Sequence, residues 1–173
     1  MSKFLNQYAI PFVNLKEGTH NFDYEITDLF FDNFEFSEIS KGKLTVNITL
    51  ERQTSMLILI FNIEGTVVVA CDICLDELVL PIKSDNTLFI KFGDDYKEET
   101  DEAIIIPINS KEINVAQYIY EYIHLALPIK RVHPLNDKKE STCDPLMLRK
   151  LDELKCNSSN NSTWDVLKNL NKN

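Results

Sequence analysis

The sequence predicts an α+β fold: an antiparallel sheet or partial β-barrel with one long packed helix and a helical C-terminal tail. Three patterns indicate this fold. Residues 43–51 alternate polar and apolar side chains, residues 56–63 form a continuous apolar run, and residues 113–126 carry an apolar stripe at helical spacing. These patterns are typical of a half-buried strand, a central strand and a helix with one buried face, respectively.

Short strands follow one another through the first two thirds of the chain. A turn is expected at Glu64-Gly65, and residues 28–34 form either a short helix capped by Asp28 or a loop folded onto the core. The acidic residues 94–102 lack the oxygen spacing and glycine of a calcium loop and are expected to be solvated. Strands are expected over residues 8–13, 20–26, 43–51, 56–63, 66–71, 75–82, 87–92 and 104–108.

The helix is expected to open at residues 109–112, with Asn109 or Ser110 as its cap, and to end before Pro128. Its apolar stripe predicts packing against the sheet. His124 lies on this helix and is expected to be a surface or packing residue. Residues 144–154 again have helical spacing.

The length of 173 residues fits one domain with a single core. We expect this domain to span residues 1–155 and a polar, flexible tail with a short terminal helix to span residues 156–173. The net charge of -9 argues against general binding of polyanions, so no DNA partner is expected. No signal peptide is visible, and the longest apolar run, 56–61, is too short to span a membrane, so the cytoplasm is the expected location.

Cys71 and Cys74 lie between two strand-like runs, at the expected tip of a hairpin. Two thiols at this spacing can bind one metal ion or form one disulfide, and a reducing cytoplasm favours the metal. Structural zinc takes four thiolate or imidazole ligands. His133 and Cys143 follow the helix and can complete the set, and Cys156 can replace either of them. The sequence therefore predicts a zinc site formed by Cys71, Cys74, His133 and Cys143.

Other roles for the thiols stay open. Reduced cysteines can line a hairpin without binding any metal. A redox dithiol of the thioredoxin type requires a helix after the first cysteine, whereas the residues after Cys74 are strand-like. A nucleophilic dyad of His133 with Cys143 or Cys71 requires an orienting group and an oxyanion hole, which no pattern supplies. The alternative function is thus a cytoplasmic thiol-dependent enzyme, either redox or hydrolytic.

Basic side chains gather after Pro128 in an otherwise acidic chain. Such a cluster can pair with RNA phosphates, or it can be a solvated surface that balances charge. A phosphate-binding glycine loop is nearly excluded, because the chain has only 4 glycines. The candidate RNA-binding residues are Lys130, Arg131, Lys138, Lys139, Arg149 and Lys150.

Several blocks, taken in order, resemble the YceD family, the large ribosomal RNA subunit accumulation proteins. The most specific are Cys71-Asp72-Ile73-Cys74-Leu75 and the Glu-x-x-x-Leu-x-Leu-Pro pattern that ends at Pro128. The resemblance covers Tyr8 to Leu154. Its blocks are Leu15-Lys16-Glu17-Gly18, Phe30-Phe31, Cys71 to Leu75, Lys91-Phe92-Gly93, Tyr120 to Pro128 and Cys143-Asp144.

The resemblance implies a bacterial cytoplasmic protein that is not an enzyme and supports 23S rRNA processing or accumulation. Its partners would be ribosomal RNA, a basic large-subunit ribosomal protein, or both, and charge complementarity with the acidic chain favours the basic protein. Family members commonly carry a basic residue between the two cysteines, where this chain has Ile73. Many members also carry later cysteines suited to a metal site, and the matching region here offers His133 and Cys143.

Overall fold

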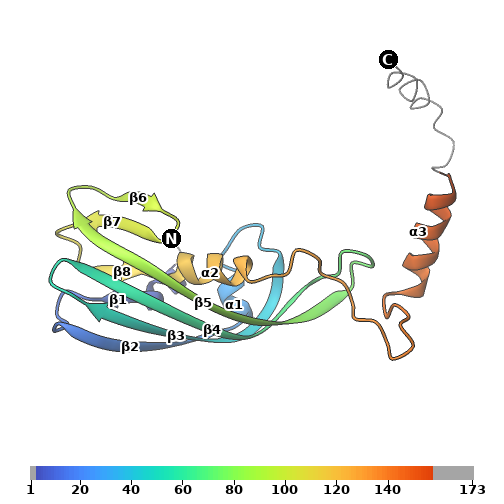
Figure 1. Cartoon of the computed structure of the whole chain (residues 1–173), viewed down its shortest axis with the longest axis horizontal. Coiled ribbons are helices and arrows are strands. Elements are labelled where there is room, and N and C mark those ends of the chain that lie inside the picture. Colours follow the sequence, from blue (N-terminus) through green and yellow to red (C-terminus); the bar gives the residue numbers. More distant parts are fainter. Residues whose placement is uncertain (1–2, 158–173) are drawn as a thin grey trace, which may run out of the picture. The chain divides into compact units, whose positions relative to one another are not determined.

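The computed structural model describes residues 3–157 (Figure 1). The chain divides into two compact units. Unit 1 consists of Met1–Val69 and Val79–Ile129, and unit 2 of Ala70–Leu78 and Lys130–Asn173. The boundary expected after residue 155 stays a prediction. The terminal helix expected in the tail lies outside the described residues.

Strands dominate unit 1, as the alternating patterns predict. The elements in chain order are a 3-10 helix η1 (Lys3–Tyr8), β1 (Ala9–Pro11), β2 (Gly18–Ile26), α1 (Asp28–Phe31), β3 (Ile39–Arg52), β4 (Met56–Ala70), β5 (Glu77–Gly93), β6 (Lys97–Thr100), β7 (Ala103–Pro107), β8 (Glu112–Asn114), α2 (Ala116–Leu125) and α3 (Pro145–Asn157). The class is therefore α+β.

The larger sheet has the strand order β2-β3-β4-β5-β7-β6, which ends at β2 and β6. The sheet is therefore open, which is the first of the two predicted alternatives. The β2–β3, β3–β4 and β6–β7 pairs are antiparallel. β5 and β7 run parallel, so the prediction of an antiparallel sheet was wrong for this pair. The cause is that β6 and β7 form an antiparallel pair in which β7, not β6, lies next to β5. β7 therefore runs in the same direction as β5.

The predicted turn at Glu64-Gly65 was wrong, because β4 continues through both residues. Gly65 pairs with Leu44 of β3, and a Cβ atom at Gly65 would overlap the β3 backbone. Glycine therefore permits a close approach of two strands here, which resembles a turn signal in the sequence. The strands expected over 75–82 and 87–92 likewise merge into the single strand β5.

The helix of unit 1 is shorter than predicted. It was expected to open at residues 109–112, but Glu112–Asn114 instead forms β8, which pairs with β1. The side-chain oxygen of Asn114 accepts the N–H of Ala116 at 2.9 Å and so satisfies one free amide of the first turn. The end of α2 at Leu125 agrees with the predicted stop before Pro128. No helix within residues 3–157 has both the length and the apolar content needed to cross a membrane.

Two acidic segments differ in detail from their predictions. α1 realises the helical alternative at residues 28–31, but Asp28 does not cap it, since its carboxylate accepts the N–H of Gly42 at 2.8 Å. Residues 94–102 are exposed over most of their length, as expected of a solvated segment. Four of them nevertheless form the edge strand β6.

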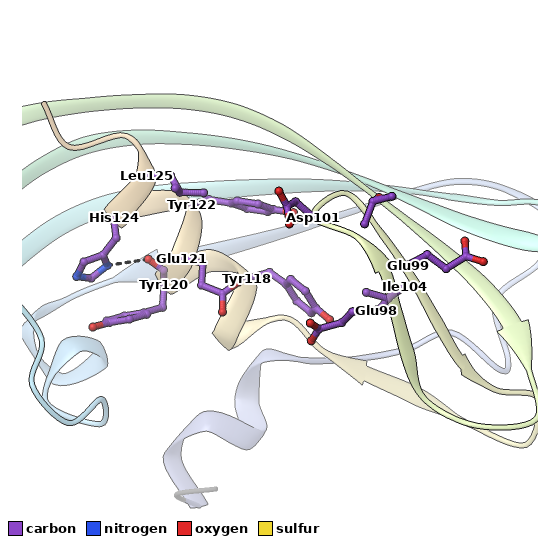
Figure 2. Close-up of a pocket in the computed structure, with 11 residues that line it drawn as sticks. Glu98, Glu99, Asp101, Ile104, Tyr118, Tyr120, Glu121, Tyr122, His124 and Leu125 are labelled. Carbon is purple, nitrogen blue, oxygen red and sulfur yellow. Dashed lines mark hydrogen bonds between the residues drawn. The ribbon is translucent and has the colours of Figure 1, made fainter. Parts of the chain in front are cut away.

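The core of unit 1 is formed by alternate residues of the central strands. Leu57, Leu59 and Phe61 of β4 are fully buried, and the ring of Phe61 lies 5.1 Å from that of Tyr122 in α2. His124 is half-buried, and its Nδ1 donates to the carbonyl oxygen of Tyr120 at 2.8 Å (Figure 2). This bond agrees with a packing role for the histidine.

Candidate metal centre

The two cysteines of the C-x-x-C pair lie in the loop that joins β4 to β5, as predicted for a hairpin tip. Cys71 N–H donates to the carbonyl of Asp76 at 2.9 Å, and Leu75 N–H donates to the carbonyl of Cys71 at 3.0 Å. Leu75 has a φ of 65°, in the left-handed region. The two hydrogen bonds and the left-handed residue form a tight turn, and both thiols lie on one side of it.

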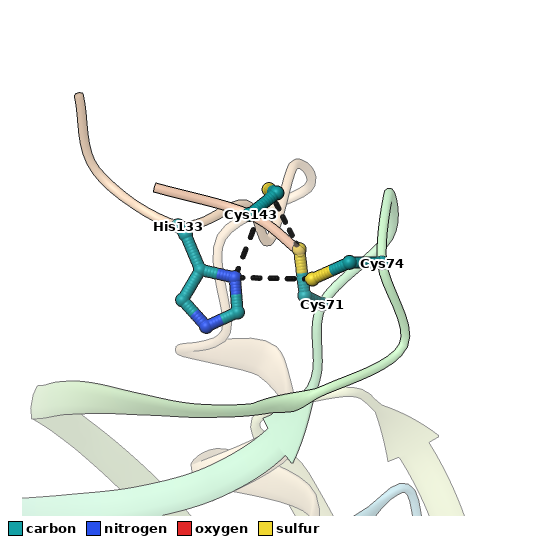
Figure 3. A group of neighbouring side chains, drawn as sticks. All are labelled: Cys71, Cys74, His133 and Cys143. Carbon is teal, nitrogen blue, oxygen red and sulfur yellow. Dashed lines mark hydrogen bonds between the residues drawn. The ribbon is translucent and has the colours of Figure 1, made fainter. Parts of the chain in front are cut away.

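Four side chains from two distant segments meet in unit 2 (Figure 3). His133 Nδ1 lies 3.3 Å from the Cys74 sulfur and 3.8 Å from the Cys143 sulfur. The Cys71 and Cys143 sulfurs are 3.8 Å apart. The donor atoms that lie within 4.8 Å of one another belong to Cys71, Cys74, His133 and Cys143.

This donor set fits a zinc ion. Around tetrahedral zinc, bonds of about 2.3 Å to sulfur and about 2.05 Å to nitrogen place two sulfurs about 3.8 Å apart and sulfur and nitrogen about 3.5 Å apart. The sulfur–sulfur distance of 3.8 Å agrees with this geometry, and the sulfur–nitrogen distances of 3.3 and 3.8 Å lie on either side of it. Three thiolates and one imidazole are a ligand set that structural zinc takes.

The environment of the cluster also suits a metal. Cys71, Cys74 and Cys143 are each at most 4% exposed. His133 Nε2 donates to the Glu77 carbonyl at 3.2 Å, which leaves the lone pair of Nδ1 facing the sulfurs. Metal-binding histidines ordinarily donate their second N–H to a carbonyl or carboxylate in this way.

The thiols differ in how readily they lose a proton. Burial is the largest influence on Cys71 and raises its pKa, but N–H groups of Cys74, Ile73 and His133 outweigh burial, with help from the Cys74 thiol, and lower the pKa to about 6. Burial raises the pKa of Cys74. The hydrogen bond with Cys143 is the main cause of a raised pKa at His133. Cys71 is thus better prepared than Cys74 to act as a thiolate ligand.

The sequence did not reveal a clamp that holds the two segments of this cluster together. The Asp72 carboxylate accepts the backbone N–H of Arg131 at 2.6 Å, and Asp72 N–H donates to the Arg131 carbonyl at 2.7 Å. The Arg131 guanidinium also lies 3.6 Å from the same carboxylate. An acidic residue inside a C-x-x-C pair was the available signal, but its partner is 59 positions away.

The six candidate RNA-binding residues all belong to unit 2. Arg131 is half-buried and paired with Asp72, which gives it a structural role. The structure does not describe the side chain of Cys156, the alternative metal ligand. RNA binding at these positions stays a prediction. The other five basic side chains are exposed: Lys130, Lys138, Lys139, Arg149 and Lys150.

Comparisons with known proteins identify the family of the chain. A family model described as large ribosomal RNA subunit accumulation protein YceD matches residues 59–171. The match contains the four donor residues and the six basic residues, whereas residues 8–58 of the resemblance lie outside it. No curated protein and no solved structure matches the chain. Because the matched segment covers more than half of the sequence, the chain belongs to the YceD family.

Proposed function

We propose that this chain is a non-catalytic bacterial factor in large ribosomal subunit biogenesis, which supports 23S rRNA processing or accumulation in the cytoplasm. Its direct partner is rRNA, a basic large-subunit ribosomal protein, or both. One observation carries the proposal: unit 2 contains the complete donor cluster together with all six candidate RNA-binding residues. Membership of the YceD family supports the link to large-subunit rRNA.

In this proposal a zinc ion is held by Cys71, Cys74, His133 and Cys143. The ion supplies a cross-link that ties the β4–β5 loop to residues 131–143 and so fixes the backbone that carries the lysines. Donor distances and burial support this role. The same burial argues against the thiol-dependent enzyme, because a substrate has little access to thiols that are at most 4% exposed.

Charge is divided unevenly between the two units. Unit 2 has nine Lys or Arg and nine Asp or Glu, so the whole net charge of -9 falls on unit 1. A strongly acidic unit repels phosphate, whereas a neutral unit with exposed lysines can approach it. The charge distribution therefore favours unit 2 as the part that contacts RNA.

Charge reversal tests the proposal. Lys130→Glu, Lys138→Glu and Lys139→Glu are combined in one full-length variant, and binding to a 23S rRNA transcript is measured across a salt series. We expect weaker binding and a log–log salt slope reduced by about one for each lysine that contacts phosphate. Arg131 is left intact because it pairs with Asp72.

The matched control carries the same charge change in unit 1, as Lys16→Glu, Lys43→Glu and Lys111→Glu. All three control residues are exposed. The proposal requires that the control keep most of the affinity. Equal losses in the two variants would show that only net charge matters, and an unchanged slope in the first variant would remove unit 2 as the RNA contact.

A further inference from the structure

A pocket of about 750 Å³ lies in unit 1 between α2 and the β6–β7 strands (Figure 2). Its wall is strongly acidic, and no Lys or Arg is among the described residues that line it. A cleft lined by charges of one sign concentrates its field and attracts ligands of the opposite charge. The carboxylates come from β6, the β6–β7 turn and α2, and they belong to Glu98, Glu99, Asp101 and Glu121.

Aromatic rings form much of the remaining wall. Tyr118 and Tyr122 lie four positions apart on one side of α2, whereas the Tyr120 ring stacks on Phe34 at a centroid distance of 4.0 Å and an interplanar angle of 12° and lies 4.1 Å from the His124 ring. Rings of this kind attract cations through their faces. A hydrated metal ion gains little from such a wall, whereas an organic cation with an apolar stem can use both the rings and the carboxylates.

A buried hydroxyl in this pocket lacks a partner. Tyr122 is 7% exposed, and its hydroxyl is one of the few buried side-chain polar atoms of the described residues that form no hydrogen bond. Figure 2 shows this side chain extending from α2 toward Asp101. Burial, and then the charges of Glu121 and Glu102, raise the pKa of Tyr122 to about 12, so the hydroxyl stays protonated. Buried polar groups are seldom left unpaired, and this oxygen can accept an N–H from a ligand.

We propose that the pocket binds an arginine side chain from an extended basic segment of a ribosomal protein. A guanidinium is planar, stacks on aromatic faces, and donates five N–H groups in a fork that matches carboxylates. Its plane suits the rings of Tyr118 and Tyr122, and its N–H groups suit a carboxylate and the Tyr122 hydroxyl. An ammonium group is a compact, more strongly hydrated charge and uses the rings less well.

Glu99 is ion-paired with Lys91 at 2.7 Å, so the carboxylates that retain capacity for a ligand are those of Glu98, Asp101 and Glu121. Glu98 accepts from the Tyr96 hydroxyl at 2.9 Å, and Glu121 accepts from the Gln117 amide at 2.7 Å. An ionised carboxylate has about four acceptor positions, so one bond of this kind leaves most of them open. β6 also ends the strand order of the sheet, so one of its edges has no neighbouring strand among the described residues. Such an edge can pair with an extended peptide.

The inference rests on the proposed function only in naming a ribosomal protein as the source of the segment. It is tested on the full chain with a fluorescein-labelled peptide of alternating arginine and serine. Fluorescence anisotropy is measured at about 0.15 M salt, where charges more than about 8 Å apart in solvent are largely screened. A lysine–serine peptide of equal length and charge is the comparison probe.

Two variants separate the pocket from the net charge. Glu98→Gln with Glu121→Gln removes two charges from the pocket, and Glu17→Gln with Glu25→Gln removes two exposed charges at β2, the opposite end of the strand order. We expect the pocket variant to bind the arginine peptide about tenfold more weakly and the control to change less than about twofold. Equal losses in the two variants would overturn the inference.

Tyr122→Phe tests the unpaired hydroxyl. The variant keeps the ring and removes one oxygen, so a purely structural role predicts unchanged peptide affinity and equal or higher stability. The inference predicts affinity reduced about fivefold and a smaller preference for arginine over lysine. Unchanged affinity overturns it, as does full displacement of the peptide by millimolar magnesium alone. Loss of peptide binding with normal rRNA binding would reject the pocket and leave the proposed function standing.

Discussion

The two units of this chain are stabilised in different ways. Unit 1 buries alternate residues of long strands, such as Leu57, Leu59 and Phe61. In the described part of unit 2, the buried apolar residues are Leu78 and three cysteines. A segment with so little apolar core needs a covalent or metal cross-link to keep one structure. The comparison leads us to expect that the cysteine cluster, by binding zinc as proposed, stabilises unit 2 as the hydrophobic core stabilises unit 1.

Removal of the proposed zinc ion should have the largest effect and should act on unit 2 alone. For structural zinc sites the binding free energy is folding free energy, of the order of 10 kcal/mol or more. Protein purified without a metal-affinity tag should contain about one zinc per chain. After chelation, hydrogen exchange should show loss of protection at the amides of Cys71, Asp72 and Leu75, with β3 and β4 unchanged.

Cysteine variants sharpen this prediction. Cys71→Ser should abolish zinc binding, whereas Cys156→Ser should retain it, because Cys143 already completes the donor set. Loss of zinc from the Cys156→Ser variant would instead show that Cys156 is a ligand. If the metal-free protein kept full hydrogen-exchange protection at these three amides, the proposed role of zinc as a cross-link would be wrong.

A cavity in unit 1 should have the second largest effect. Leu59 is fully buried in β4, so Leu59→Ala should lower the free energy of unfolding by about 2–5 kcal/mol. Leu29→Ala at a side chain that is 62% exposed is the matched control and should change stability by less than about 0.5 kcal/mol. Denaturant unfolding and zinc content are measured together. Zinc release by folded Leu59→Ala protein would contradict the expectation that the metal acts on unit 2 alone.

The clamp at Asp72 should have the smallest effect. Asp72→Asn keeps an acceptor for the Arg131 amide but removes the ion pair, so zinc transfer to a chromogenic chelator should accelerate about fivefold, equivalent to about 1 kcal/mol. Asp137→Asn changes an exposed carboxylate of the same unit and serves as control. Equal rates of zinc transfer in the two variants would show that the Asp72 clamp does not slow the release of zinc.

Local patterns predicted most of the strands, although two pairs of them merge into β4 and β5, and residue types indicated the four side chains that converge. Period-two alternation survives in β3 because one face of that strand is buried, and the spacing of Cys71 and Cys74 directly placed two thiols on one loop. The other two donors were predicted from residue type, and the structure shows that all four converge. That convergence depends on the return of the chain after α2, which no local pattern encodes.

Features that depend on distant partners were missed. Gly65 was interpreted as a turn because the sequence does not show that the β3 backbone lies against it. β8 was interpreted as the start of a helix because its pairing with β1 joins residues about a hundred positions apart. The pocket at Tyr122 was missed because alternate tyrosines on a helix give no sign of an unpaired hydroxyl.

The separation of the cluster along the chain sets the order of events during synthesis. Cys71 and Cys143 are 72 positions apart. At bacterial and eukaryotic elongation rates of about 5–20 residues per second, the first thiols wait roughly 4–14 seconds for the last ligand. The first segment of unit 1, Met1–Val69, precedes this interval, and its second segment, Val79–Ile129, is synthesised within it. Unit 1 can therefore begin to fold before the four donors meet, and binding of the proposed zinc ion would be the last of these steps.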